Sequence, residues 1–315
     1  MTKVLIGVDG SDRAEDAIAF GRAIALAAGA PVILATAHQI DPRQPRLDRY
    51  PASEGLREEA EAMLARYALM LLDVGDVERR LLADHSPARA LQESAGQVGA
   101  GIIVVGSSHV GRFGRVLPGS TAERLLHGAP CPVAVVPVGF RERGLAEHPV
   151  IGCAYLATRD GMTALGAAES LALAIGGSLR VMQVVEPPSY LYDSGEMPLN
   201  MPDIDAKVRA DADRALHERV EHLSAGLRDV EGTIHVGKPA DTLSALSETV
   251  DVMVVGSRGY GPLKSVFLGG VSGRLLRSAA CPVIVVPRRS HATVGSLFEP
   301  AGEVPQGSTS PRGMA

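Results

Sequence analysis

The chain lacks the features that mark several large classes of protein. It has no tryptophan, only 3% aromatic residues, three cysteines among 315 residues and a formal net charge of −5. Cysteines this scarce, with no CxxC pair, argue against a disulfide scaffold and a structural zinc site. The small negative charge provides no basic footprint for nucleic acid. These absences leave a globular protein of a reducing compartment.

Long apolar runs are also missing. No window of the sequence approaches the roughly 20 apolar residues of a membrane-spanning helix. The apolar run after the N-terminus ends at Asp9, which is too short for the apolar region of a secretory signal. We therefore expect a cytoplasmic protein with no membrane attachment. With 46% hydrophobic and 21% charged residues, the chain can bury the core of one large or two ordinary domains.

The most informative feature that is present is an internal repeat. Residues 102–137, IIVVGSSHVGRFGRVLPGSTAERLLHGAPCPVAVVP, align without a gap with residues 252–287 at an offset of 150. This alignment pairs Gly106 with Gly256, Gly119 with Gly269, and Cys131 with Cys281. Such self-similarity over a whole segment indicates a duplication.

The upstream halves of the two repeats agree more loosely. They align when about two residues are inserted near Leu156, and Ala154 then falls where the first repeat has Asp9. We expect two tandem domains, residues 1–142 and 148–289, separated by a polar stretch. Ten of the last twenty-five residues are Gly, Pro or Ser without apolar periodicity, so residues 290–315 are predicted to be a disordered tail.

Within each repeat, apolar runs alternate with helical patterns. In the first repeat the predicted strands are 4–8, 32–37, 78–83, 101–105 and 133–136, and the predicted helices begin near Asp12, with Glu15 three residues on, and cover 56–72 and 87–98. Strands separated by helices pair in parallel through right-handed crossovers. The predicted fold class is therefore α/β, with two tandem doubly wound domains, each built on a parallel five-stranded sheet. Ligands of such sheets bind beyond the carboxyl ends of the strands.

A glycine-rich loop follows a strand at this edge in each repeat. Glycine can adopt positive φ and lets backbone N–H groups approach an anion closely. The glycines concerned are Gly106 and Gly119 in the first repeat and Gly256, Gly259 and Gly269 in the second. Each loop leads into a predicted helix, near Ser120 or Val271, whose N-terminus favours a phosphate.

Asp9 follows the first strand at the same edge. It is placed to accept a hydrogen bond from a ribose hydroxyl, or to hold a divalent cation such as Mg²⁺ or Mn²⁺ against phosphates. Simpler roles stay open: Asp9 as a turn former, Ser120 as a helix N-cap, the glycines as turns, and His109 as a solvated loop residue. Cys131 and Cys281, each followed by proline, are predicted to be buried small residues.

Four segments of the chain resemble the universal stress protein family in its tandem two-domain form. They are IGVDGS, GSRGYGPLKSVFLGGVS, HGAPCPVAVVP and SAACPVIVVP, and the resemblance extends from Lys3 to Pro287. Its most specific mark is G-x2-G-x9-G followed by Ser or Thr. The resemblance implies ATP, ADP or AMP in each domain, with adenine beside the second strand, ribose near the aspartate and phosphates in the loop.

The two repeats match this motif unequally. The first has Asp9, Ala37, Val105, Gly106, Gly119 and Ser120, but His109 stands where the second glycine belongs. The second keeps Gly256, Gly259 and Gly269 with Val184 and Val255 at the adenine wall, but has Gly270 for the hydroxyl residue, Ala154 for the acid and Ser272 nearby. Losing a hydroxyl and an acid reduces the free energy of nucleotide binding more than the backbone strain of a histidine in the loop does. The first site is therefore predicted to bind nucleotide more tightly than the second.

The family resemblance also implies pairing through the last strand. The apolar edges 133–136 and 283–286 are expected to pair within one chain, giving an internal pseudo-twofold dimer. The predicted function is an ATP-binding stress regulator or sensor that is not an enzyme, with at most slow ATP hydrolysis, an unknown protein partner and room for a homodimer.

Two other hypotheses remain. A degenerate tandem protein would bind no nucleotide and act through protein contacts. An adenylating or pyrophosphatase-type enzyme would need an SGG-type or acid-rich loop after the first strand, which VDGSD does not supply.

Overall fold

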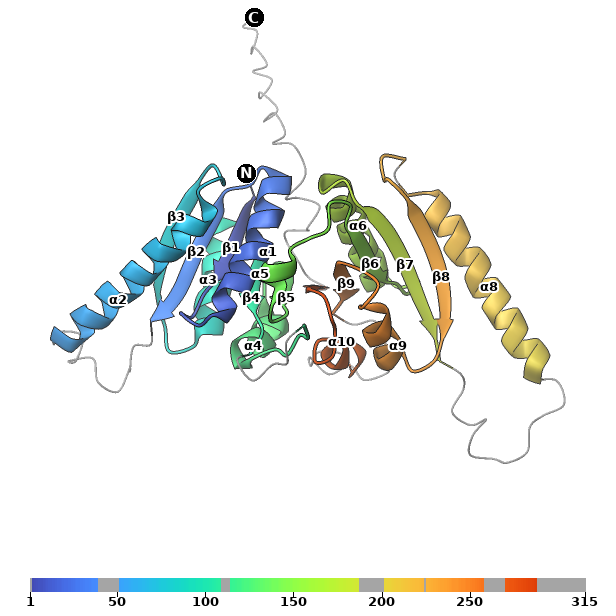
Figure 1. The fold of residues 1–315 in the computed structure, drawn as a ribbon. Coiled ribbons are helices and arrows are strands. Elements are labelled where there is room, and N and C mark those ends of the chain that lie inside the picture. The colour runs from blue at the N-terminus through green and yellow to red at the C-terminus, as the bar shows by residue number, and fades with distance from the viewer. Residues whose placement is uncertain are drawn as a thin grey trace, which may run out of the picture.

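The computed structural model describes residues 2–38, 51–108, 114–186, 201–223, 225–257 and 270–287. His109, Gly259, Gly269 and the predicted tail lie outside the described residues. Within the described part, ten strands form one sheet in the order β3-β2-β1-β4-β5-β10-β9-β6-β7-β8. The two halves lie on either side of the β5–β10 junction, with the long helices α2 and α8 at the two outer ends (Figure 1).

Each half has the same alternation of strands and helices in its described part, to which the first half adds η2 and α5. The first comprises β1 (Lys3–Gly7), α1 (Arg13–Ala28), β2 (Val32–His38), α2 (Pro51–Ala68), the 3₁₀ helix η2 (Leu69–Leu71), β3 (Val77–Ala83), α3 (Pro87–Val98), β4 (Ala100–Gly106), α4 (Ser120–Gly128), β5 (Val133–Val136) and α5 (Phe140–Arg143). The second comprises β6 (Val150–Ala154), α6 (Arg159–Ala174), β7 (Ser178–Val185), α8 (Met201–Glu221), β8 (Val230–Val236), α9 (Pro239–Leu246), β9 (Val252–Gly256), α10 (Gly270–Leu275) and β10 (Val283–Val286).

Strand pairing confirms the predicted doubly wound sheets. Within each half all neighbouring strands are parallel, and the order 3-2-1-4-5 puts a reversal between the first and fourth strands. The halves join where β5 pairs antiparallel with β10, with Ala134 opposite Ile284. The predicted pairing of these two edges within one chain is therefore confirmed. Both edge strands are fully buried, so neither is left to aggregate.

Local chemistry explains most element boundaries. Helices α1 and α3 end at Gly29 and Gly99, which adopt φ of 56° and 64° and close the last turn. Helix α2 begins at Pro51, five residues before the predicted start, because proline suits the first turn of a helix. The sequence favours Asp12 as the capping residue of α1; Asp12 stands at the N-cap, but its side chain makes no capping hydrogen bond.

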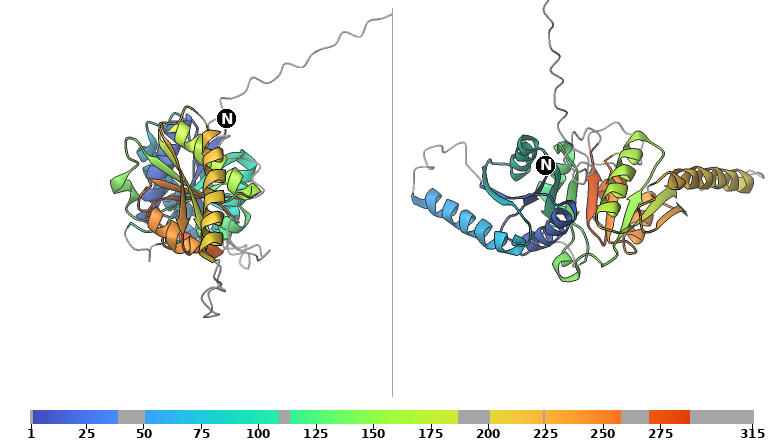
Figure 2. Two further views of the ribbon diagram at one scale, coloured as in Figure 1. Left: turned by 90° about the vertical axis from the view of Figure 1, so that its right-hand side faces the viewer. Right: turned by 90° about the horizontal axis from the view of Figure 1, so that it is seen from above.

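Apolar side chains form a core on each face of the sheet. One cluster includes Val4, Ile6 and Val104 with Cys153 and Val254, and the other includes Leu5, Ile103 and Val105 with Met253 and Val255. Both clusters run through the two halves, and Figure 2 shows helices on both sides of the continuous sheet. Among the described helices, none is both long enough and apolar enough to cross a membrane.

The three cysteines are free thiols buried in these cores. Cys131, Cys153 and Cys281 are at most 3% exposed, and burial raises the pKa of each thiol to about 12. We therefore expect the native protein to resist a thiol reagent at pH 8 and to react at three positions after denaturation, because only exposed thiolates are nucleophilic. Spectrophotometric thiol titration with and without guanidinium measures this. Rapid reaction of the native protein would contradict the burial of these residues.

Candidate functional site

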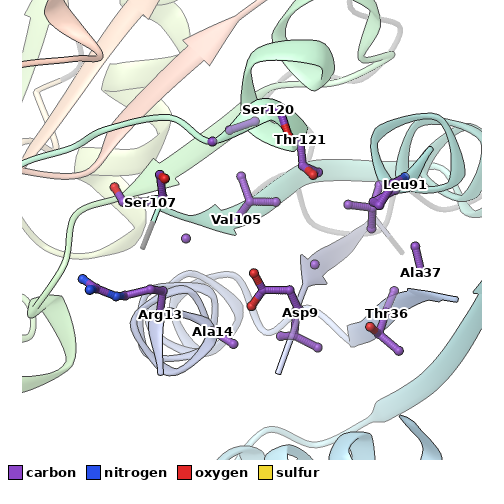
Figure 3. A pocket seen from close by; sticks show the side chains of 18 residues that line it. Asp9, Arg13, Ala14, Thr36, Ala37, Leu91, Val105, Ser107, Ser120 and Thr121 are labelled. Atoms are coloured by element: carbon purple, nitrogen blue, oxygen red, sulfur yellow. The ribbon is translucent and has the colours of Figure 1, made fainter. Parts of the chain in front are cut away.

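A cleft of about 450 Å³ opens at the carboxyl edge of the first half, beside the strand-order reversal between β1 and β4. Six of the predicted site residues line it together: Asp9, Ala37, Val105, Gly106, Gly119 and Ser120. The structure adds lining residues that sequence reasoning missed, among them Arg13, Thr36, Leu91, Ser107, Ser108 and Thr121 (Figure 3). Separate strand ends and helix starts therefore converge as predicted for a ligand crevice.

Asp9 shapes a local turn and keeps one carboxylate oxygen available to the cleft. Its Oδ1 accepts hydrogen bonds from the backbone N–H of Ser11 at 3.0 Å and from the Ser11 hydroxyl at 2.6 Å. Gly10, which lies between Asp9 and Ser11 in the chain, adopts φ of 82°. Asp9 thus shapes the turn into α1. The residue is exposed within the cleft, and in the described part of the chain no hydrogen bond reaches its Oδ2. That oxygen can accept from a ligand hydroxyl.

Gly106 is required for close packing and not for positive φ. The glycines with positive φ among the described residues include Gly10 and Gly114 but neither Gly106, Gly119 nor Gly256, so that part of the prediction is wrong. A Cβ on Gly106 would come within 2.6 Å of the carbonyl oxygen of Arg13. Glycine at this strand end therefore lets α1 approach β4 and brings the start of the helix to the cleft.

The N-terminus of α4 faces the same cleft without a side-chain cap. Gly119 is the N-cap residue, with φ of −78° and ψ of 173°, and among the described residues no side-chain hydrogen bond caps the first turn. Ser120 is the first helical residue, so the alternative role as an N-cap is wrong for it. The first N–H groups of a helix need partners, and an anion is a favourable one. Ser120 and Thr121 place two hydroxyls beside these groups.

Hydrogen bonds close the base of the loop between β4 and α4. Ser108 N donates to Leu117 O at 2.6 Å, and Leu117 N donates to the Ser107 hydroxyl at 3.2 Å. Ser107 N in turn bonds to Val136 O on β5 at 2.9 Å. The described ends of the loop are thereby held against the sheet, which positions the cleft-lining Ser107 and Ser108.

The residue of the second half that is equivalent to Asp9 differs from the one that the sequence alignment gave. β1 pairs Gly7 with Val105, and β6 pairs Ala154 with Val255, so Ala154 corresponds to Gly7. Val8 N bonds to Ala35 O, and Tyr155 N makes the same bond to Met182 O. The counterpart of Asp9 is therefore Leu156, and the two helices follow without an insertion. The pairing of Ala154 with Asp9 was wrong, but the conclusion that the second half lacks the acid holds.

This register reveals a charge reversal at the cleft. A Cβ on Gly256 would lie 3.1 Å from the carbonyl oxygen of Asp160, which is the contact that Gly106 makes with Arg13. Arg13, the first residue of α1, and Asp160, the second residue of α6, therefore occupy equivalent positions against the sheet. Arg13 is half-buried at the first cleft, whereas Asp160 is 9% exposed. A cation favours a phosphate at this place and a carboxylate opposes it.

Larger side chains occupy the floor of the second half. Ala154, Met182 and Val184 stand where the first has Gly7, Ala35 and Ala37, and all three are at most 4% exposed. Of the other predicted residues, Val255 is buried at 1% exposure and Gly270 opens α10.

Ser272, the hydroxyl expected to remain in the second half, serves the fold. Its hydroxyl donates to the carbonyl oxygen of Gly256 at 3.1 Å and is therefore engaged within the domain, and the residue is 1% exposed.

A resident metal centre has no support among the described residues, where no group of three or more His, Cys, Asp or Glu side chains is placed to hold an ion. Asp9 is the single carboxylate among the described residues that line the first cleft. One carboxylate suits a cation that arrives with phosphates and keeps most of its waters.

Comparisons with known proteins agree with this architecture. The model of the universal stress protein family matches residues 1–137 and again residues 150–287. Two universal stress proteins of Mycobacterium tuberculosis are similar: one is 29% identical over 75% of this chain and 80% of its own length, the other 27% identical over 90% and 96%. The crystal structure of a universal stress protein from Archaeoglobus fulgidus matches with a TM-score of 0.63 at 20% identity, covering 91% of this chain and 96% of that one.

The fold and the repeated edge define a tandem pair of doubly wound α/β domains with a cleft beside the first glycine loop. With the family model matching both halves, the chain belongs to the universal stress protein family, in its tandem two-domain form.

Proposed function

We propose that the chain is an ATP-binding regulator or sensor of stress, with two adenine-nucleotide sites of unequal quality and the working one in the first domain. The observation that carries the proposal is the convergence of Asp9, Arg13 and the start of α4, whose N-cap residue is Gly119, on one cleft of about 450 Å³. A volume of this size suits a small-molecule ligand.

The lining of the cleft divides into an apolar and an anion-binding part. Ala37, Val105 and Leu91 offer apolar contact to a base, and Asp9 Oδ2 offers an acceptor to a ribose hydroxyl. The first N–H groups of α4 and the Arg13 guanidinium would hold phosphates. A nucleotide-bound Mg²⁺ or Mn²⁺ would neutralise phosphate charge, with Asp9 as its protein contact.

The same lining argues for binding and against efficient catalysis. Hydrolysis needs a base that activates water, and Asp9 is the single carboxylate that the described lining supplies. Because Asp9 Oδ1 is already engaged by Ser11, we propose at most slow ATP hydrolysis.

We also propose that the two domains comprise residues 1–142 and 148–289, as the sequence predicts.

Asp9→Ala is expected to weaken ATP binding about tenfold, because a hydrogen bond from a neutral donor to a charged acceptor contributes roughly 1.5–3 kcal/mol. Calorimetric titration of ATP measures this, and mass spectrometry of nucleotide released from the purified protein identifies the natural ligand. Asp12→Ala is the matched control, because Asp12 lies three residues on, is exposed and is not among the lining residues.

Two outcomes would contradict the proposal. If the wild-type protein releases no adenine nucleotide and binds none in titration, the degenerate, protein-binding alternative takes its place. If Gly259→Ala weakens binding and Asp9→Ala does not, the second site is the working one.

A further inference from the structure

The loop between β4 and α4 does not belong to the first domain alone. Its described part after the gap, residues 114–119, reaches across the junction to the second domain. The Arg115 guanidinium forms an ion pair with Glu248, and its Nη1 donates to the carbonyl oxygen of Ser278 at 2.9 Å. The next residue, Val116, donates its N–H to Ala279 O at 2.8 Å and is fully buried.

The receiving segment, residues 278–280 between α10 and β10, is itself firmly held. Ala280 N donates to the Ser247 hydroxyl at 2.9 Å, and the Ser247 hydroxyl donates to Ser244 O at 2.6 Å. The Ser244 hydroxyl bonds to the same Ser278 carbonyl that receives Arg115. Ser247 is 1% exposed and Ala279 is fully buried. Residues 278–280 therefore form a fixed support, which we name the 278–280 support.

The loop is thus fastened at two places. Its base is closed by the bonds of Ser107 and Ser108 to Leu117 within the first domain. Its outer part is fastened by Arg115 and Val116 to the 278–280 support in the second. Leu117, which closes the base, directly follows Val116 and lies two residues before Gly119, the N-cap of the helix that faces the cleft. The second domain therefore bears directly on the geometry of the anion-binding end of the cleft.

We propose that Arg115 is a positioning residue, through which the second domain holds the phosphate-binding loop of the first domain in its binding geometry. The inference rests on the proposed nucleotide function and adds to it a role for the second repeat, which has Leu156 and Asp160 where the first has Asp9 and Arg13. Because binding and domain contact are coupled, a nucleotide in the first cleft must also favour the contact between Arg115 and the second domain.

Arg115→Ala is expected to weaken ATP binding about two- to tenfold. This is the size of effect that results when an exposed ion pair is lost and its loss is coupled to a binding site. Adenosine affinity should stay at the wild-type value, because adenosine carries no phosphate to contact the loop. Arg143→Ala is the matched control: Arg143 Nη2 donates across the same junction to Ala280 O at 3.1 Å, but from α5 and not from the loop. Calorimetric titration of the full chain with ATP and, separately, adenosine measures both affinities.

The possible results separate the two proposals. A wild-type protein that binds neither ATP nor adenosine refutes the proposed function and the inference with it. If the wild type binds ATP and Arg115→Ala binds it equally well, only the inference is overturned. It is also overturned if Arg143→Ala loses as much ATP affinity as Arg115→Ala, or if adenosine affinity falls in parallel with ATP affinity, since either result indicates a general loss of structure.

Discussion

Arg13→Glu is expected to weaken ATP binding by about a hundredfold while the protein stays folded. The substitution replaces a cationic residue of the cleft lining with the kind of charge that Asp160 carries at the equivalent place in the second half. A charge-assisted bond contributes roughly 1.5–3 kcal/mol, and repulsion adds to the loss, so about 3 kcal/mol in total corresponds to the hundredfold change. Calorimetric titration measures the affinity, and circular dichroism checks the fold.

Neutral and symmetry-related variants control this experiment. Arg13→Gln removes the charge without reversing it and should lose about tenfold. Asp160→Asn makes a comparable change in the second half and should leave ATP affinity unaltered. The wild-type affinity should also fall with added salt more steeply than that of Arg13→Gln, because salt screens the guanidinium. Equal ATP affinity for wild type and Arg13→Glu would show that phosphates bind elsewhere.

The counterpart of Asp9 shows where sequence comparison reached its limit. The downstream segments of the two repeats share glycines and a Cys-Pro pair at fixed spacing, which allow one alignment only. The upstream segments share an apolar run, and apolar runs match one another in several registers. The insertion of about two residues near Leu156 confined the mismatch to the strand end, where Ala154 was aligned with Asp9 in place of Leu156. Strand register settles the alignment, because main-chain pairing counts residues without regard to side chains.

The glycine loop was recognised for a reason that is only partly right. Spacing predicted correctly that Gly106 and Gly119 lie at one cleft. The physical cause at Gly106 is the carbonyl oxygen of Arg13, which belongs to a helix more than ninety residues earlier in the chain. Such a close approach depends on tertiary packing, so sequence can indicate that a glycine is needed there without showing what it accommodates.

The pairing of β5 with β10 was predictable, whereas the contact of Arg115 with the second domain was not. Two strongly apolar strands at the ends of two sheets need cover, and the chain holds one such strand in each repeat. Arg115, in contrast, has no helical or strand periodicity to place it. Its aligned partner in the second repeat is Ser265, so even the duplication gives no hint of an arginine that crosses the junction.

Asp16→Ala is expected to lower the free energy of unfolding by about 3 kcal/mol, because hydrogen bonds to a buried carboxylate are strong and their donors would be left unpaired. Asp16 is 3% exposed on α1 and accepts from Gly139 N at 3.0 Å and Arg141 N at 2.9 Å. These two bonds fasten α5, whose Phe140 packs edge-on against Phe20 of α1 with ring centroids 5.4 Å apart. Urea denaturation followed by circular dichroism measures the change, since the chain has no tryptophan for fluorescence.

Two neighbouring variants distinguish loss of these buried bonds from a general effect on α1. Asp16→Asn keeps one carbonyl acceptor and should lose about half as much stability as Asp16→Ala. Glu15→Ala removes the ion pair of Glu15 with Arg141. The two side chains are 33% and 35% exposed, and partly exposed ion pairs contribute only about 0–1 kcal/mol to the free energy of unfolding. If Asp16→Ala proved no more destabilising than Glu15→Ala, the carboxylate of Asp16 would not be what holds α5 on α1, and the Phe20–Phe140 contact would have to hold it instead.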